Sequence, residues 1–146
     1  MSLRFPLFVN LSGRKAVVIG GGTVGLRRAG ALRAFGAAVV VVAPSLGEPL
    51  DGIEHLERRY REGDLAGAFL AVAATDDRAV NHAVWEEARA GGVLINVCDC
   101  QSECDFFFPA ICRAEHLVAG VAGDGGDHRR TAQAAAAIRK TLEELP

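Results

Sequence analysis

The sequence lacks any apolar run long enough to cross a lipid bilayer, and its lysines and arginines are not gathered into a run or stripe. With a formal net charge of −2 over 146 residues, it offers no basic surface of the kind that binds nucleic acid without specificity. The first residues do not have the layout of a signal peptide. We therefore expect a cytoplasmic protein that binds neither nucleic acid nor a membrane.

Paired metal-binding cysteine motifs are also missing, although four cysteines fall close together at positions 98, 100, 104 and 112. Their spacing, C-x-C-x3-C-x7-C, matches neither a paired zinc site nor an iron–sulfur cluster. In a reducing compartment we expect free thiols and no metal site, with transient metal contact as the open alternative. His116 and His128 stand alone in the sequence, and we expect both on the surface.

The sequence does contain a strand, a glycine-rich turn and a helix in direct succession. The apolar run 16–19 leads into Gly20-x-Gly22-x-x-Gly25, after which a helical pattern begins. Gly20 allows the tight turn, Gly22 lets the backbone approach a pyrophosphate, and Gly25 allows close packing of helix on strand. The first N–H groups of the helix, including those of Thr23 and Val24, would face the phosphates. This order predicts a dinucleotide-binding turn.

Further apolar segments alternate with helical patterns along the chain. We expect strands at 38–43, 53–59, 68–73 and 93–97, and helices at 23–35 and from Thr75 to Gly91-Gly92. The first helix should bury Val24, Ala31, Leu32 and Phe35, and Thr75 should cap the second. This alternation predicts an α/β fold of the Rossmann type, with a doubly wound parallel sheet. Ligands of such sheets bind beyond the carboxyl ends of the strands.

After residue 105 the pattern changes to two strands, at 106–111 and 117–122, and a helix at 128–145. We therefore divide the chain into a Rossmann domain, 1–105, and a C-terminal strand-helix tail, 106–146. Because this tail is too small to bury its own core, we expect it to form a homodimer with a second copy. The apolar stretch 5–11 should lie against the sheet.

The second strand ends in Ala43-Pro44-Ser45, where nicotinamide-binding folds usually carry an acid for the ribose 2′-hydroxyl. The nearest acid is Glu48, and no arginine stands there for the 2′-phosphate of NADP. Backbone groups at Pro44 and the hydroxyl of Ser45 would have to hold the adenosine ribose. This missing acid argues against an ordinary dehydrogenase and against NADP.

Several separated motifs together identify a resemblance. The whole chain resembles the dehydrogenase domain of siroheme synthase and the related precorrin-2 dehydrogenases. The motifs are Phe5-Pro-Leu-Phe8, Val18-Ile-Gly-Gly-Gly-Thr-Val24, Val42-Ala-Pro44, Ala73-Ala-Thr-Asp-Asp77 with Asn81, Asn96-Val-Cys-Asp99, and Cys104-Asp-Phe-Phe-Phe-Pro-Ala110. The Ala-Pro end of the second strand, unusual in a general dehydrogenase, is normal in this family.

The resemblance implies NAD-dependent oxidation of precorrin-2 to sirohydrochlorin, with insertion of ferrous iron as a second activity left open. It makes Asp99 the residue essential to the chemistry, because a carboxylate beside the nicotinamide can accept the substrate's proton. Asp105 is the secondary candidate, and Thr75 could line the nicotinamide site. The expected cofactor-binding residues are Gly20, Gly22, Thr23, Val24, Pro44, Ser45 and Thr75.

The substrate carries many carboxylates, so the pocket should offer cations. Arg113, Arg129 and Arg130 lie in the tail expected to close over it. One departure from the family is Asp124, where relatives usually have Ser or Thr before the glycine pair 125–126. A negative charge there should repel the substrate unless it faces elsewhere.

Two other functions stay open. The nucleotide-sensing domains of potassium transporters and channels share the length, the glycine turn and the Ala-Thr-Asp-Asp-like segment. They normally carry the acid after the second strand that this chain lacks, and they have no reason for the Phe5 or Cys104 motifs. A structural subunit that keeps the fold without turnover is the third hypothesis. It is kept open by Asp124 and by the end of the sequence after the helix near Leu145, where longer relatives continue into a further helical domain.

Overall fold

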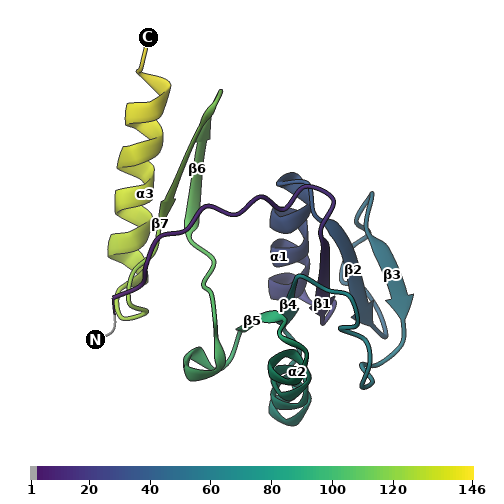
Figure 1. Ribbon diagram of the computed structural model, residues 1–146. Helices are drawn as coiled ribbons and strands as arrows, with labels where there is room; N and C mark the ends of the chain where they lie inside the picture. Colours follow the sequence, from purple (N-terminus) through teal and green to yellow (C-terminus); the bar gives the residue numbers. More distant parts are fainter. Residues whose placement is uncertain (1–2) are drawn as a thin grey trace. The chain divides into compact units, whose positions relative to one another are not determined.

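The computed structural model describes residues 3–146, which divide into two compact units (Figure 1). The sheet unit comprises residues 9–106. The hairpin unit comprises residues 107–146 together with the described residues 3–8. The division thus falls one residue after the predicted domain boundary and groups the N-terminal segment with the tail.

The sheet unit contains five parallel strands in the order β3-β2-β1-β4-β5. This order confirms the predicted Rossmann-type α/β sheet, in which the chain runs outward from β1 first in one direction and then in the other. The strands are β1 (Lys15–Ile19), β2 (Ala38–Ala43), β3 (Glu54–Glu57), β4 (Leu70–Ala73) and β5 (Leu94–Val97).

The central strands are buried on both faces, as their valine-rich sequences indicate. Val18 and Val41 are completely buried, and Val17 and Val42 are 1% exposed. Residues on alternate faces of one strand can all be apolar only where helices cover both sides of the sheet. The edge strand β3 is shorter than the predicted 53–59, since its sequence, Glu-His-Leu-Glu, offers little apolar surface to bury.

Helix α1 (Thr23–Ala34) buries a face different from the predicted one. The buried residues are Gly25, Leu26, Ala29 and Leu32, whereas Val24 is 39% exposed. Of the four predicted core positions, only Leu32 is correct. The small residues at 25 and 29 let the helix approach the strands closely, so the face that contains them is the buried one. Gly36 ends the helix region with φ +90°, in the left-handed region as predicted.

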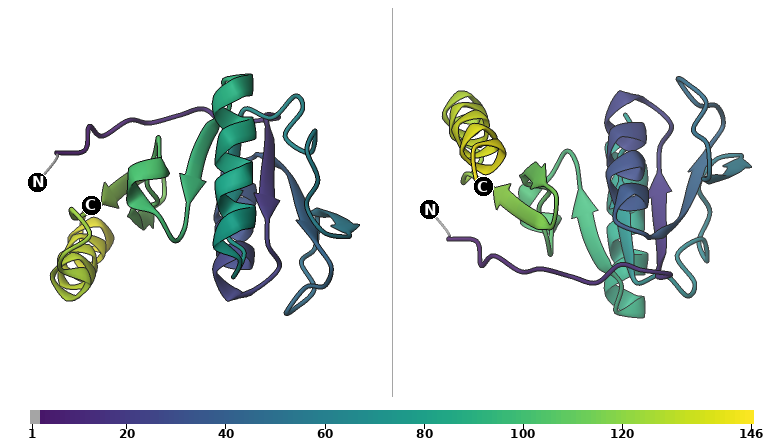
Figure 2. Two further views of the ribbon diagram at one scale, coloured as in Figure 1. Left: turned by 90° about the horizontal axis from the view of Figure 1, so that it is seen from below. Right: turned by 90° about the horizontal axis from the view of Figure 1, so that it is seen from above.

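Helix α2 (Arg78–Gly91) buries Asn81, Val84 and Ala88, and Gly92 ends it with φ +67°. The side chain of Asp77 caps its first turn by accepting hydrogen bonds from the N–H groups of Ala79 and Val80. Figure 2 shows α1 and α2 running alongside the strands. Both helix N-termini therefore lie at the carboxyl edge of the sheet.

A paired charge fixes the loop between β3 and β4. Arg58 donates two hydrogen bonds to Asp64, at 2.8 and 2.7 Å, and the N–H of Arg61 donates a third at 2.9 Å. These hydrogen bonds, led by those from Arg58, lower the pKa of Asp64 below its ordinary value despite the opposing effect of burial. The ionised form of Asp64 therefore stabilises the folded loop.

The hairpin unit consists of β6 (Ala110–Ala114), β7 (Leu117–Val121) and α3 (His128–Glu143). The predicted bounds 106–111 are wrong, because β6 begins only after Pro109, which has no N–H to donate. The tight turn places Glu115 at φ +46°. Among the residues of this unit that the structure describes, only Cys112 and Ala135 are buried, with the Cys112 thiol donating to the carbonyl of Ala135 at 3.4 Å.

The apolar N-terminal stretch up to Phe8 belongs to the hairpin unit. Phe5, Leu7 and Phe8 are 86%, 72% and 76% exposed, so this unit does not bury them. Within the hairpin unit, Arg4 donates to the carbonyl of Gly123 at 2.6 Å and stacks 3.6 Å above the Phe107 ring. Polar and cation–π contacts of Arg4 therefore attach this segment to the hairpin unit.

Candidate functional site

The turn between β1 and α1 (residues 20–25, the glycine turn) is shaped by two close backbone approaches. Gly20 has φ +123°, and a side chain there would collide with the carbonyl of Ala74 at the end of β4. A side chain on Gly25 would collide with the carbonyl of Gly20. Packing therefore requires glycine at both positions, as the sequence predicted for the turn and for the helix contact.

Gly22 differs from these two, because a side chain there would meet only open space. It is the N-cap of α1, and no side chain caps that end of the helix. The protein's own packing thus does not require glycine here, whereas the close approach of a pyrophosphate would. With the exposed Thr23 and Val24 opening the helix, the turn fits the phosphates of a dinucleotide at its positive end.

Gly21, which the fingerprint leaves unassigned, joins the glycine turn to the end of β2. A side chain on Gly21 would collide with the carbonyl of Ser45, and the N–H of Gly47 donates to the carbonyl of Gly21 at 2.9 Å. Pro44 and Ser45 are exposed beside the turn. The structure thus brings together the predicted phosphate and ribose segments through a contact that a G-x-G-x-x-G pattern does not reveal.

His55 on β3 is a second residue at this place that the sequence did not point to. Its Nε2 lies 2.8 Å from the carbonyl oxygen of Ala43, which requires a proton on Nε2. This hydrogen bond holds the carbonyl where β2 turns into the Pro44-Ser45 segment. His55 pairs with Val41, two residues before Ala43 on β2. Knowledge of this pairing register would have been needed to find the contact.

Thr75, at the end of β4, does not cap α2 as predicted. Its N–H and its hydroxyl donate to Oδ1 of Asn81, at 3.1 and 2.7 Å, and its carbonyl accepts from Nδ2 of Asn81 at 3.1 Å. Asn81 is completely buried. The correction follows from this partner: a buried amide with three hydrogen bonds competes for Thr75, and Asp77 caps the helix instead.

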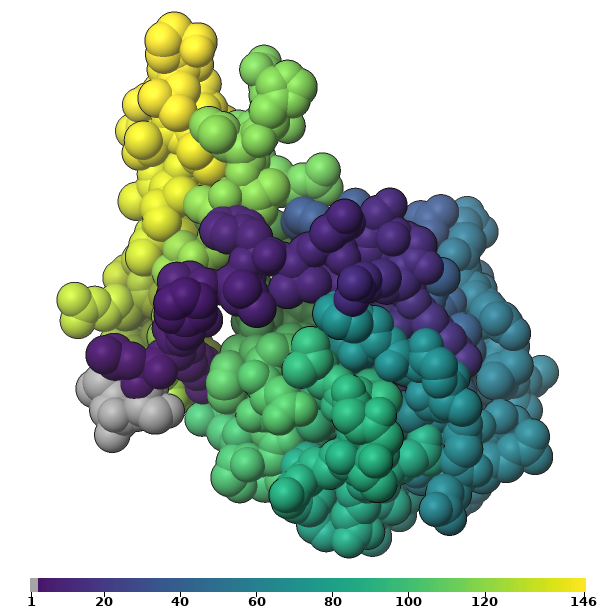
Figure 3. Space-filling model, in the orientation of Figure 1, coloured from purple at the N-terminus to yellow at the C-terminus, as the bar shows by residue number. Residues whose placement is uncertain are grey.

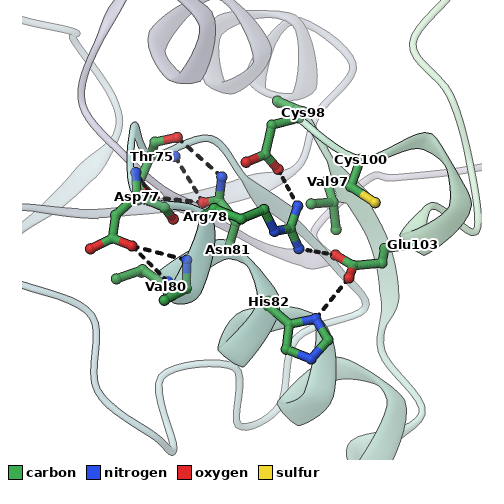
Figure 4. Close-up of polar contacts among 12 residues, drawn as sticks. Thr75, Asp77, Arg78, Val80, Asn81, His82, Val97, Cys98, Cys100 and Glu103 are labelled. Carbon is green, nitrogen blue, oxygen red and sulfur yellow. Dashed lines mark hydrogen bonds and ion pairs between the residues drawn. The ribbon is translucent and has the colours of Figure 1, made fainter.

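Asp99 follows β5 at the same edge of the sheet, and Arg78 at the start of α2 donates to its Oδ1 at 2.6 Å. The same guanidinium also binds Glu103 in η1 (Gln101–Glu103), and Glu103 in turn contacts Nδ1 of His82 at 2.7 Å. Figure 4 shows Arg78 and His82 both pointing from α2 toward Glu103. Neither Arg78 nor Glu103 belongs to a motif that marks it in the sequence.

Asp105 lies in the segment after η1, where it braces the free edge of β5. Its Oδ2 accepts from the N–H of Ile95 at 3.1 Å, and its own N–H donates to the carbonyl of Ile95 at 2.8 Å. Asn96 donates to the carbonyl of Phe106 at 3.0 Å. The C-terminal end of the loop that carries Asp99 is therefore held to β5 by hydrogen bonds.

The cysteines of this loop are free thiols. The thiol of Cys104 contacts both the N–H and the carbonyl of Val97, at 3.1 and 3.2 Å. Cys98 is an exposed residue, but partial burial of its sulfur raises the pKa of the thiol. The charge of the Arg28 guanidinium acts in the opposite direction. Within residues 3–146, no group of three or more His, Cys, Asp or Glu is placed to hold a metal ion.

The predicted cations and the departure Asp124 belong to the hairpin unit. Arg129 and Arg130 lie in the first turn of α3, which Asp127 caps by accepting from the N–H of Arg130 at 2.9 Å. Asp124 accepts from the N–H of Gly126 at 3.0 Å, which makes it part of the turn before α3. Its carboxylate has a local structural partner.

A pocket of about 530 Å³ opens at the opposite edge of the sheet, where β1, β2 and β3 begin. Two of its polar side chains are already used by the protein: Lys15 donates to the carbonyl of Ala66 at 2.9 Å, and Asp64 pairs with Arg58. This pocket lies away from the glycine turn and Asp99. The described helices include none that is long and apolar enough to cross a membrane.

The chain is similar to several known proteins. A family of proteins described as putative NAD(P)-binding matches residues 7–110. The probable multifunctional siroheme biosynthesis protein HemA of Ruminiclostridium josui is 40% identical over 144 residues, covering 94% of this chain and 28% of that protein. The siroheme synthase of Stutzerimonas stutzeri is 44% identical over 128 residues, covering 84% of this chain and 27% of that protein.

Among solved structures, that of SirC, a precorrin-2 dehydrogenase, superposes with a TM-score of 0.79 at 26% identity. The match covers 94% of this chain and 71% of that chain. This chain spans just over a quarter of the length of the two curated relatives. The family match covers the glycine turn and the loop that carries Asp99, so the chain belongs to the family of putative NAD(P)-binding proteins.

Proposed function

We propose that this protein oxidises precorrin-2 to sirohydrochlorin with NAD as the hydride acceptor. The observation that carries the proposal is the position of the Asp99 carboxylate, which follows β5 at the same edge of the sheet as the glycine turn. Doubly wound sheets bind ligands beyond these strand ends. The names of the siroheme-synthesising relatives and of SirC support the choice of substrate.

The reaction removes two hydrogens from a reduced macrocycle. One carbon–hydrogen bond breaks with its electron pair, and NAD, when bound, supplies the acceptor for that hydride. A second hydrogen leaves as a proton, and Asp99 is placed to take it on a carboxylate oxygen. A new double bond then extends the conjugation of the product. The protein's part is to hold both reactants and to receive this proton.

Each group of predicted binding residues has a separate task. Gly22, Thr23 and Val24 bind the pyrophosphate with backbone N–H groups at the start of α1. Pro44 and Ser45 border the adenosine ribose, where no arginine stands to bind the 2′-phosphate of NADP. Thr75, held by Asn81, borders the nicotinamide end. Asp105 stays secondary to Asp99, because one of its oxygens is already bonded to β5.

The hairpin unit supports a homodimer as the working form. A two-stranded sheet covered by one helix leaves one sheet face open. Val118 lies on this open face opposite Arg113, because α3 covers the other face, where Cys112 is buried, and Val118 is 40% exposed. Few apolar side chains of this unit are buried within one copy. A second copy packed on the same face would cover Val118.

Anaerobic incubation with precorrin-2 and NAD tests the proposed function. We expect sirohydrochlorin absorbance and NADH to appear together in equal amounts, and NADP to be used poorly. Bound NAD without turnover would favour the sensor or the structural subunit. Ferrous iron, added afterwards, decides whether the protein also uses iron as a substrate: siroheme formation above the rate without protein would show a second activity.

A further inference from the structure

Arg78 holds the candidate catalytic carboxylate from a different structural element. It is the first residue of α2, whereas Asp99 lies in the loop after β5, 21 residues further along the chain. The guanidinium reaches Oδ1 of Asp99 at 2.6 Å. Among the described residues, no other hydrogen bond to the Asp99 carboxylate is found, so Oδ2 has no hydrogen-bond partner there.

The second branch of the guanidinium is anchored on Glu103. Glu103 binds Arg78 with one oxygen and His82 with the other, and its side chain is only 13% exposed. His82 lies one turn after Arg78, so both side chains project from the same face of α2. In the space-filling view, α2 and the residues after β5 form adjoining parts of one surface (Figure 3). The network thus joins helix and loop at two points.

The charges within the network favour this arrangement. Hydrogen bonding to Glu103 is the largest influence on Arg78 and raises the pKa of its guanidinium, which stays fully charged. Burial alone would raise the pKa of Glu103, but the hydrogen bonds from His82 and Arg78 outweigh it and lower the pKa. At neutral pH an ionised Glu103 therefore holds the charged guanidinium of Arg78.

We propose that Arg78 is a positioning residue for Asp99. By fixing Oδ1 while itself fixed by Glu103, it aims Oδ2 toward the space beyond the strand ends, where the substrate's proton is released. This inference rests on the proposed function, in which Asp99 accepts that proton. A free aspartate in a loop would sample several rotamers, and only some of them would point an oxygen at the substrate.

The test compares three variants with the wild-type protein. Arg78→Met removes the charge and the two nitrogens that bind Asp99 and Glu103, whereas Arg78→Lys keeps the charge with a single donor group. Arg89→Met makes the same change near the far end of α2, where Arg89 stacks on Trp85. For each, kcat for precorrin-2 oxidation, KM for NAD and the urea midpoint are measured. Because Arg78 is 45% exposed, we expect all three variants to fold.

We expect Arg78→Met to lower kcat by about 100-fold, with KM for NAD changed by less than about twofold. Arg78→Lys should recover part of the lost rate, and Arg89→Met should match the wild type. In an Asp99→Asn background, Arg78→Met should lower kcat by less than about twofold further, because its effect passes through Asp99.

Failure of the role of Arg78 can be distinguished from failure of the proposed function. Normal kcat in Arg78→Met, in a protein whose wild type oxidises precorrin-2, would overturn the role of Arg78 and leave the proposed function intact. So would a full 100-fold loss in the Asp99→Asn background. A wild-type protein that binds NAD and does not oxidise precorrin-2 would overturn both.

Discussion

The side chain of Asn81 makes three hydrogen bonds to Thr75, binding its N–H, its hydroxyl and its carbonyl. Asn81 is completely buried on α2, and Thr75 is the second residue after β4. The pair therefore joins the helix to the strand end that borders the proposed nicotinamide site. Losing the amide would leave polar groups of Thr75 without their partners in a partly buried place.

We predict that Asn81→Ala lowers the free energy of unfolding by about 2 kcal/mol, since polar groups of Thr75 lose their partners and a cavity is left. Urea denaturation measures the change. Glu86→Ala, on the exposed face of the same helix, should stay within about 0.5 kcal/mol of the wild type. Equal stability of the two variants would contradict the structural role of the Asn81–Thr75 pair.

Asp99→Asn should lower kcat for precorrin-2 oxidation by at least about 100-fold, because the amide cannot accept the proton. The dissociation constant for NAD, followed by NADH fluorescence competition, should not change. Asp76→Asn, the same replacement at an exposed position of the same sheet edge, serves as the control and should retain full activity. An active Asp99→Asn variant would remove Asp99 from the mechanism.

Gly22→Ser separates cofactor binding from folding. Serine is a good N-cap, so the stability of α1 should be kept or slightly raised, while NAD affinity should fall by at least about tenfold because the side chain occupies the pyrophosphate's place. Calorimetric titration with NAD provides the measurement. Gly30→Ala, in the middle of α1 with open space around it, should gain about 1 kcal/mol of stability and bind NAD normally.

Acid should weaken the fold partly through Asp64. Because Arg58 lowers the pKa of Asp64 in the folded state, the stabilisation is present above the ordinary value of 3.8 and is lost as the pH falls below it. Asp64→Asn and Arg58→Met should each flatten the dependence of the unfolding free energy on pH in that range. Urea titrations at a series of pH values will show this, and an unchanged acid slope in both variants would refute it.

The proposed dimer predicts a sedimentation coefficient of two copies at micromolar concentration in analytical ultracentrifugation. Val118→Asp should shift the protein toward monomer, because it replaces an apolar contact by a charge on the open face of the hairpin sheet. Leu94→Asp, at a similarly exposed position of the sheet unit, should leave the dimer intact. A monomeric wild type would rule out the dimer.

The parallel α/β sheet could be predicted because its signals are local. The valine run of β2 and the glycines 36 and 92 report their own conformation, and both helix ends lie where these glycines indicate. The roles of Gly20 and Gly25 followed from the fingerprint for the same reason. In contrast, β6 was placed too early, since the three phenylalanines before Pro109 look like a strand and do not form one.

The rest of the site depends on side-chain partners that the sequence does not reveal. Thr75 looks like a helix cap until its hydrogen bonds to Asn81 are known. Arg78 and Glu103 look like ordinary surface charges, and only the fold brings them together beside Asp99. Gly21 occupies a variable position of the fingerprint, and its need for glycine comes from the carbonyl of Ser45.

The contact between Gly21 and Ser45 constrains how the cofactor preference of this protein could be engineered. The carbonyl of Ser45 abuts the glycine turn, but its side chain is exposed, so replacing the side chain leaves the backbone contact in place. Ser45→Arg is thus a reasonable first step toward NADP use. An insertion between Pro44 and Gly47 would instead push the backbone into the turn that binds the pyrophosphate. In this fold, cofactor choice can change by side-chain replacement and not by loop length.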